Sequence, residues 1–113
     1  MARVKPVDER VYNQELGGVK VTIQLYSQRP NEEIMISLPG PSVWQGKLLP
    51  LVQRLWTDND GRIVVMLPPS EEIKALTPRN PVPGLYKLQC ASIGTLTFEV
   101  PNVAEWMLGT ELG

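Results

Sequence analysis

The stretch VKVTIQL, at residues 19–25, decides the fold class of this chain. Its apolar side chains alternate strictly with Lys20, Thr22 and Gln24, a pattern typical of a strand with one face buried and the other in solvent. An amphipathic helix would instead repeat its apolar residues every three or four positions. Residues 19–25 therefore predict a half-buried β-strand.

Further short apolar stretches follow, separated by proline and glycine. The segments 34–38, 52–56, 62–67, 85–90 and 95–100 are rich in β-branched residues or alternate in polarity, as strands do. Eleven prolines, about twice ordinary usage, argue against long helices. About six strands at such spacing predict an all-β fold, namely a small antiparallel β-sandwich of the immunoglobulin or transthyretin type.

The two ends of the chain are expected to differ from this domain. Residues 1–18 mix charges with apolar residues and end in a glycine pair, so we expect an N-terminal arm that precedes a domain at 19–113. The alternative is an unattached terminus. The arm's apolar residues favour docking on a partner, and its candidate contacts are Val4, Val7, Val11 and Tyr12.

Two segments have the pattern of short helices. Residues 70–76 begin with a serine and two glutamates, which suit a helix start. Asn102 and Glu105 have the spacing of a capping box. The stripe Val103, Trp106 and Met107 then predicts a short C-terminal helix that covers an open end of the sandwich and offers a contact.

Composition excludes several function classes. The chain has 113 residues, 11 basic and 12 acidic residues, no histidine and one cysteine. Without histidine, the commonest general base and zinc ligand are missing. The balanced charge argues against a nucleic-acid partner, and no apolar run approaches the roughly 20 residues that span a bilayer. We expect no enzyme activity, cofactor, metal or membrane anchor, and a protein assembled in a cytosol.

The acidic segment around Gly61 has two interpretations. Asp58 and Asp60 resemble part of a calcium loop, but the glutamate required six residues after the glycine is replaced by Leu67. Asp-Gly before an apolar run is instead the strongest short signal of a hairpin turn. We therefore expect a structural turn. The pair Glu32-Glu33 is likewise explained by a turn rather than by a glycosidase site.

The three tryptophans are candidates for contact or core positions. Trp44 lies in an expected loop at 42–47, and Trp56 ends a strand. Stacking on nucleic-acid bases would need surplus basic charge, which this chain lacks. Trp44 and Trp106 are therefore candidate interface residues. Near-zero net charge and apolar stripes at both ends predict a homo-oligomer, with Trp106 at a contact.

A resemblance covers residues 56–101 most closely. Thr57-Asp58-Asn59-Asp60-Gly61-Arg62, then Leu67-Pro68-Pro69-Ser70, then Tyr86-Lys87-Leu88, then Phe98-Glu99-Val100-Pro101 resemble small transthyretin-like or carboxypeptidase-regulatory-like β-sandwiches. More narrowly, they are similar to the N-terminal attachment domains of bacteriophage tail-fibre and minor tail proteins. The proline-rich 80–84 loop and the chain end at Gly113 depart from that pattern.

The resemblance implies a structural protein of a virion, most of all a tail or fibre-attachment component that contacts other virion proteins. A capsid cement protein is the nearest alternative. A stand-alone bacterial carbohydrate- or protein-binding module is an alternative of another class, and a small hydrolase is a distant third. The resemblance also implies that localisation is the virion, after assembly in the host cytoplasm.

Overall fold

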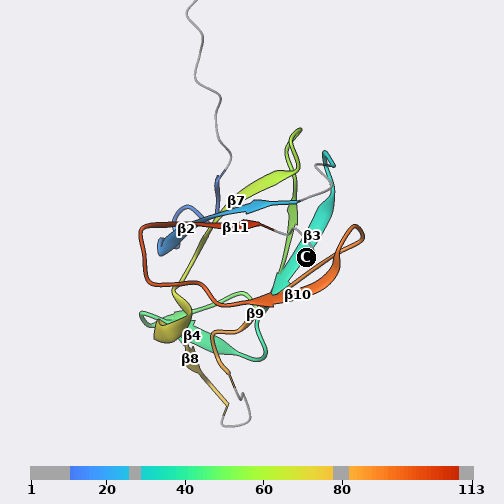
Figure 1. Ribbon diagram of the computed structural model, residues 1–113. Helices are drawn as coiled ribbons and strands as arrows, with labels where there is room; N and C mark the ends of the chain where they lie inside the picture. The colour runs from blue at the N-terminus through green and yellow to red at the C-terminus, as the bar shows by residue number, and fades with distance from the viewer. Residues whose placement is uncertain (1–10, 26–28, 78–81, 110–113) are drawn as a thin grey trace, which may run out of the picture.

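The computed structural model describes residues 11–25, 29–77 and 82–109. Over these residues the chain is all-β, which confirms the predicted class (Figure 1). A single turn of 3₁₀ helix, η1, spans Ser70–Glu72. The strands are β1 (Val11–Tyr12), β2 (Val19–Gln24), β3 (Glu33–Ser37), β4 (Ser42–Trp44), β5 (Lys47–Leu48), β6 (Val52–Trp56), β7 (Arg62–Leu67), β8 (Lys74–Ala75), β9 (Tyr86–Cys90), β10 (Gly94–Phe98) and β11 (Glu105–Gly109).

The first sheet has the order β1-β7-β2-β11 and contains both strand directions. β2 and β7 are antiparallel, with Val21 opposite Val65. β1 runs parallel to β7, and β11 runs parallel to β2. The prediction of a purely antiparallel fold is therefore wrong at these two edges. The reason is that each outer strand pairs with a strand distant in sequence, so no tight turn between the two partners imposes an antiparallel direction.

The second sheet has the order β10-β9-β3-β6 and is antiparallel throughout. β9 and β10, two of the predicted strands, form a hairpin around Gly94, which has a φ of 80°. A third sheet, β5-β4-β8, includes the segment that was expected to be a loop. There Gln45 and Gly46 both have positive φ, 52° and 75°, as a two-residue turn between antiparallel strands requires.

The Asp58–Gly61 turn joins two different sheets rather than two paired strands. β6 pairs with β3, whereas β7 pairs with β1 and β2. The hairpin part of the prediction is therefore wrong. The turn itself is tight: Gly61 has a φ of 74°, and the Asp58 N–H donates to the Arg62 carbonyl oxygen at 2.9 Å.

Neither predicted helix forms. Only η1 remains of the one at 70–76, and Lys74–Ala75 is already strand β8. Residues 105–109 form β11, in which Trp106 and Leu108 are half-buried and alternate with exposed residues. Residues 105–109 form a strand because they pair with the edge of β2 at five positions. This pairing satisfies backbone groups of β2 that would stay unpaired if residues 105–109 formed a helix.

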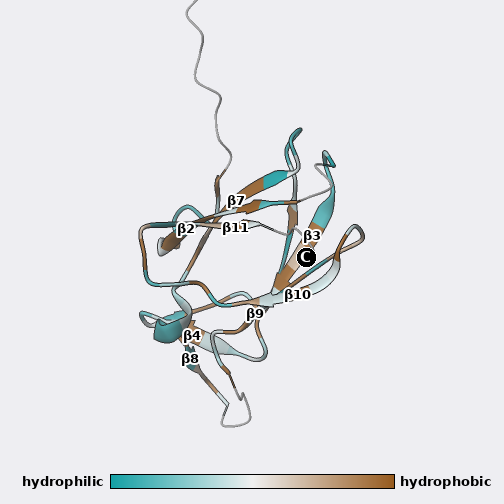
Figure 2. Cartoon of the chain, viewed as in Figure 1, coloured by the Kyte–Doolittle hydropathy of each residue, from teal (hydrophilic) through white to brown (hydrophobic). Residues whose placement is uncertain are grey.

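One hydrophobic core receives side chains from all three sheets. Val21, Ile23 and Val65 come from the first sheet, and Ile36 and Leu88 from the second, each no more than 1% exposed. Apolar segments lie along β2, β7 and β3 in Figure 2. The alternation of residues 19–25 thus buries the side that the sequence predicts.

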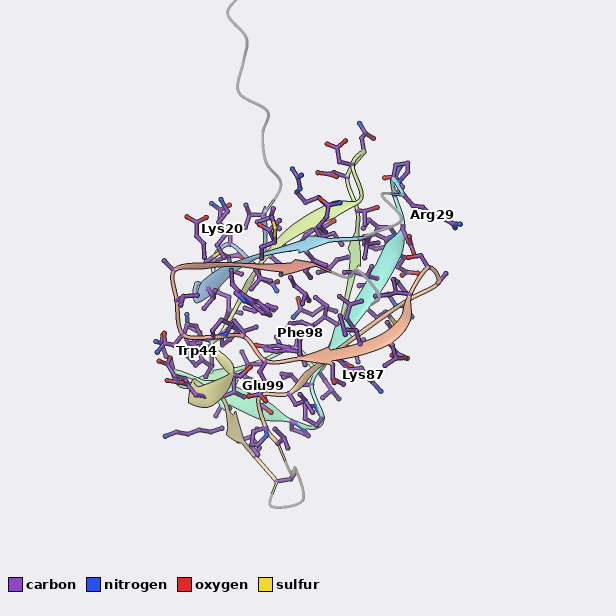
Figure 3. All side chains as sticks on the ribbon, in the orientation of Figure 1. Lys20, Arg29, Trp44, Lys87, Phe98 and Glu99 are labelled. Carbon is purple, nitrogen blue, oxygen red and sulfur yellow. The ribbon has the colours of Figure 1, made fainter. Side chains whose placement is uncertain are left out.

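Aromatic residues link the first and second sheets at both edges. At one edge the Trp56 N–H donates to the Tyr12 hydroxyl, which in turn donates to the Trp56 carbonyl oxygen, at 3.3 and 3.4 Å. At the other edge Trp106 packs on Phe98, with ring centroids 6.1 Å apart. Phe98 lies in the interior in Figure 3 and also stacks on Tyr86 at 5.4 Å.

A buried junction, made by Pro68, Ser70, Gly84, Tyr86 and Val100, ties three distant segments together. The Tyr86 hydroxyl donates to the Pro68 carbonyl oxygen at 3.0 Å. The Val100 N–H donates to Ser70 Oγ at 2.7 Å, and the Ser70 N–H donates to the Val100 carbonyl oxygen at 2.9 Å. A Cβ at Gly84 would lie 2.2 Å from the Ser70 carbonyl oxygen. Burial raises the pKa of the Tyr86 phenol.

Candidate interaction surfaces

The N-terminal contact candidates lie partly in the first sheet. Val11 and Tyr12 form β1 and are half-buried. Tyr12 packs against the core, and its hydroxyl contacts β6. Val4 and Val7 lie outside the described residues. The described part of the first sheet therefore includes Val11 and Tyr12, inside the segment that the sequence assigns to an arm.

The C-terminal stripe does not form one face. In β11, Trp106 points inward onto Phe98, whereas Met107 points outward and is 62% exposed. Val103 precedes the strand and is 46% exposed. The helical spacing that grouped these residues does not apply to a strand, in which neighbours point to opposite sides. Trp106 is thus mainly a packing residue.

Trp44 fills the core instead of the surface. It is 5% exposed, and its indole N–H donates to Glu72 Oε1 at 2.9 Å. Its position at the end of β4 places the ring on the inner face of the third sheet, next to the buried Ser42 two positions earlier. Its place as an interface candidate is therefore corrected: the indole is not available to a partner.

The acidic turn uses its carboxylate on its own backbone. Asp58 Oδ1 accepts the N–H groups of Asp60 and Arg62, at 2.8 and 3.0 Å. This arrangement is an Asx-type turn, which needs no cation. Among the residues that the structure describes, no group of three or more histidine, cysteine or acidic side chains could hold a metal ion.

The outer face of the third sheet carries the most exposed large apolar side chain in the described ranges. Leu48 is 70% exposed and lies opposite Val43, which also pairs with Lys74. Leu76 is 54% exposed and lies next to these residues, because its N–H donates a hydrogen bond to the Pro41 carbonyl oxygen. We define the outer face of the third sheet as Pro41, Val43, Leu48, Lys74 and Leu76.

Two further exposed apolar side chains lie at the start of β6 and just before it. Leu51 is 46% exposed and Val52 is 53% exposed. Apolar surface gathered in this way marks interaction sites in soluble proteins. Sequence reasoning missed this face because Leu48 ends a strand of two residues and Leu76 follows another, and no period can be read in elements so short.

A hollow of about 470 Å³ lies on the outer face of the second sheet. Its lining includes Glu33, Met35, Gln89 and Thr95, which the strand register places near one another across β3, β9 and β10. Beside it, Arg54 on β6 lies opposite Met35, and its Nε is 3.8 Å from Glu33 Oε2. The face therefore combines polar, charged and apolar groups.

Glu32 borders this hollow, and only one of its two carboxylate oxygens has a hydrogen-bond partner among the described residues. Its Oε2 accepts the Ser92 N–H at 2.9 Å, whereas Oε1 is buried and has no hydrogen-bond partner in the described part of the chain. Burial raises the pKa of this carboxyl, but hydrogen bonds from Ser92 and Cys90 and the charge of Arg29 outweigh burial. The pKa of Glu32 is consequently lowered, which favours the charged carboxylate.

Cys90 also lines the hollow, and nothing around it indicates reactivity. The thiol is half-buried, and its Sγ lies 3.5 Å from Ser92 Oγ. A reactive cysteine is usually activated by a nearby positive charge, histidine or helix N-terminus. We therefore expect Cys90 to be an inert thiol.

The described residues contain no helix long and apolar enough to cross a membrane. No protein-family model matches the sequence, and a search of curated proteins finds no match.

Proposed function

We propose that this protein is a non-enzymatic structural component of a bacteriophage particle, most specifically a tail or fibre-attachment component. In this proposal the two four-stranded sheets form a transthyretin-like β-sandwich that serves as a rigid platform. It is made in the host cytoplasm, enters the virion, and acts through protein–protein contacts with neighbouring copies and other virion proteins.

The observation that carries this proposal is the outer face of the third sheet. Leu48 and Leu76 expose 70% and 54% of their area on one side of a small sheet whose other side is packed into the core. Burying such apolar surface stabilises an association by about 25 cal/mol per Å² before the costs of binding are subtracted. The face is therefore suited to permanent contact with another protein surface.

The occupant we propose for this face is a neighbouring copy of the same chain. A net charge of −1 gives little electrostatic repulsion between copies. Most oligomers of one chain close around a symmetry axis. Several copies around such an axis would cover the apolar face while leaving other surfaces for further virion proteins.

The residues that carry the resemblance support the proposal in a different way. Pro68, Ser70, Tyr86 and Val100 meet in the buried junction, and Thr57 Oγ1 donates to the Arg29 carbonyl oxygen while accepting the Glu32 N–H. These are framework positions. They support kinship in fold with the attachment domains, whereas the contact surface lies elsewhere.

The test is whether the protein belongs to intact particles. Particles from the source cells are purified by density gradient, and an antibody against the protein is applied to each fraction. We expect the protein to band with particles in fixed proportion to a capsid protein, and immunogold labelling to lie at the tail. Label on the capsid would favour a cement protein instead. Its absence from particles, with abundant protein in the cells, would refute both.

Self-association is tested on the purified chain. Analytical ultracentrifugation should show a concentration-dependent oligomer. Because Lys74 lies on the same face, the substitution Lys74→Glu should weaken that oligomer by adding a charge reversal at the contact. A matched reversal at Lys20, on the outer side of the first sheet (Figure 3), should leave it unchanged. A strict monomer at high concentration would contradict the proposed occupant.

A further inference from the structure

The geometry points to a carbohydrate-binding site on the outer face of the second sheet, in which Trp56 stacks on a sugar ring and the adjacent hollow hydrogen-bonds the sugar's hydroxyl groups. This site lies on a different sheet from the proposed contact between copies. It therefore stands independently of the proposed virion role.

The strand register places the aromatic ring beside the hollow. Trp56 lies opposite Glu33, which lines the hollow. The next row of the same face runs from Arg54 through Met35 and Gln89 to Thr95, across all four strands. Because residues two apart on a strand share one face, Trp56 and this row form a continuous surface.

Trp56 is available for stacking. Its side chain leaves the core side of the strand to Leu55, which is 3% exposed, whereas Trp56 is 47% exposed. Its backbone is held by the Tyr12 hydroxyl at the edge of the sheet. A large aromatic ring on a fixed strand binds an apolar ring face with little loss of side-chain entropy.

The hollow supplies mostly hydrogen-bond acceptors for hydroxyl groups. Glu33 lines it with a side chain that is 45% exposed, so its carboxylate can accept hydrogen bonds from a ligand's hydroxyl groups, whereas Oε1 of Glu32 is buried. Gln89 and Thr95 add an amide and a hydroxyl, which donate as well as accept. A volume of about 470 Å³ falls within the usual range of ligand pockets.

The charge on this face favours a neutral sugar over a basic peptide. Arg54 already lies against Glu33, with Nε and Oε2 3.8 Å apart. Lys87 is on the same outer face, two positions from Gln89, and points away from the interior in Figure 3. Glu32 and Glu33 balance these two cations, so the face has no excess charge of either sign, which favours a neutral polyhydroxyl ligand over a strongly basic segment.

The experiment uses the full chain, labelled with ¹⁵N, and a panel of neutral and acidic oligosaccharides. We expect at least one neutral oligosaccharide to bind with a Kd in about the millimolar range or tighter. Its addition should shift the amide signals of residues 33–35, 56, 89 and 95. Titration calorimetry then gives the affinity of each variant for that oligosaccharide.

Two variants on β6 make the test specific. Trp56→Ala should lower the affinity at least about tenfold. Val52→Ala is the control, because Val52 is 53% exposed on the same side of the same strand, where Trp56 is 47% exposed, and it should bind as the original chain does. Thermal unfolding of both variants shows whether the fold is kept, and Trp56→Phe, which retains an aromatic ring, should keep part of the affinity.

Three results would overturn the inference. These are no shift with any oligosaccharide of the panel, equal affinity in Trp56→Ala and the original chain, or binding of a lysine-rich peptide at these residues in place of a sugar. None of them bears on particle association, so a failure here is distinguishable from a failure of the proposed function.

Discussion

The buried junction and the outer face of the third sheet reverse the usual relation between polarity and position. Ser70 is polar and 8% exposed, whereas Leu48 is apolar and 70% exposed. Ser70 is stable inside because both its hydroxyl and its N–H are bonded to Val100. Leu48 stays exposed because it points away from the hydrophobic core, which packs against the opposite side of the third sheet. The difference separates residues that hold the fold from residues that are free to make contacts.

The largest effect is expected from Gly84→Ala in the buried junction. The added Cβ would lie 2.2 Å from a backbone oxygen, that of Ser70, which cannot move aside as a flexible side chain could. We expect a loss of at least about 3 kcal/mol in the free energy of unfolding, measured by urea denaturation. Gly109→Ala is the control, because no described atom outside its chain neighbours lies within 4 Å of its Cβ position. Equal stability of the two variants would contradict the close approach.

A smaller effect is expected at the turn between the two large sheets. Gly61 has a φ of 74°, which a β-branched residue adopts only with strain. Gly61→Val should therefore cost about 1–3 kcal/mol of stability, seen as a lower midpoint in thermal unfolding. Gly61→Asn, which tolerates this conformation, should retain most of the stability. If calcium raised and a chelator lowered the midpoint, the structural interpretation of the turn would be wrong.

Tyr86→Phe removes one hydrogen bond from the junction and leaves the ring in place. The Pro68 carbonyl oxygen would lose its donor from the Tyr86 hydroxyl, 3.0 Å away. We expect a loss of about 1.5 kcal/mol, measured by urea denaturation. Tyr12→Phe, at the half-buried edge of the first sheet, should cost less, since water can replace its hydroxyl contact. The reverse order would mean that the junction is less important than its burial indicates.

The smallest effect on stability is expected at the outer face of the third sheet. The double substitution Leu48→Ser and Leu76→Ser should change the free energy of unfolding by no more than about 0.5 kcal/mol, because both side chains are mainly exposed. The same variant should lose self-association in analytical ultracentrifugation. If the double variant unfolded, these leucines would be needed for the fold, as the junction residues are. If it still associated as the original chain does, this face would not be the contact between copies.

Much of the strand content was predictable because strand and core share one period of two. The alternation in 19–25 follows from side-chain direction along a strand, and the strand at 62–67 follows from the preference of β-branched residues for strands. The C-terminal prediction was wrong because Val103, Trp106 and Met107 also match a helical period. Local sequence contains no signal that the edge of β2 is available to pair with residues 105–109.

The sequence alone therefore determined the all-β class, most of the strands, the glycine turn and the absence of histidine chemistry. Only the tertiary structure decided that Trp44 is buried, that Trp106 packs on Phe98, and that Leu48 and Leu76 share an exposed face. The physical reason is that strand formation and the side to which each side chain points depend on neighbouring residues in the chain, whereas burial depends on contacts between strands far apart in sequence. A single tryptophan or leucine is equally compatible with core and surface until those contacts form.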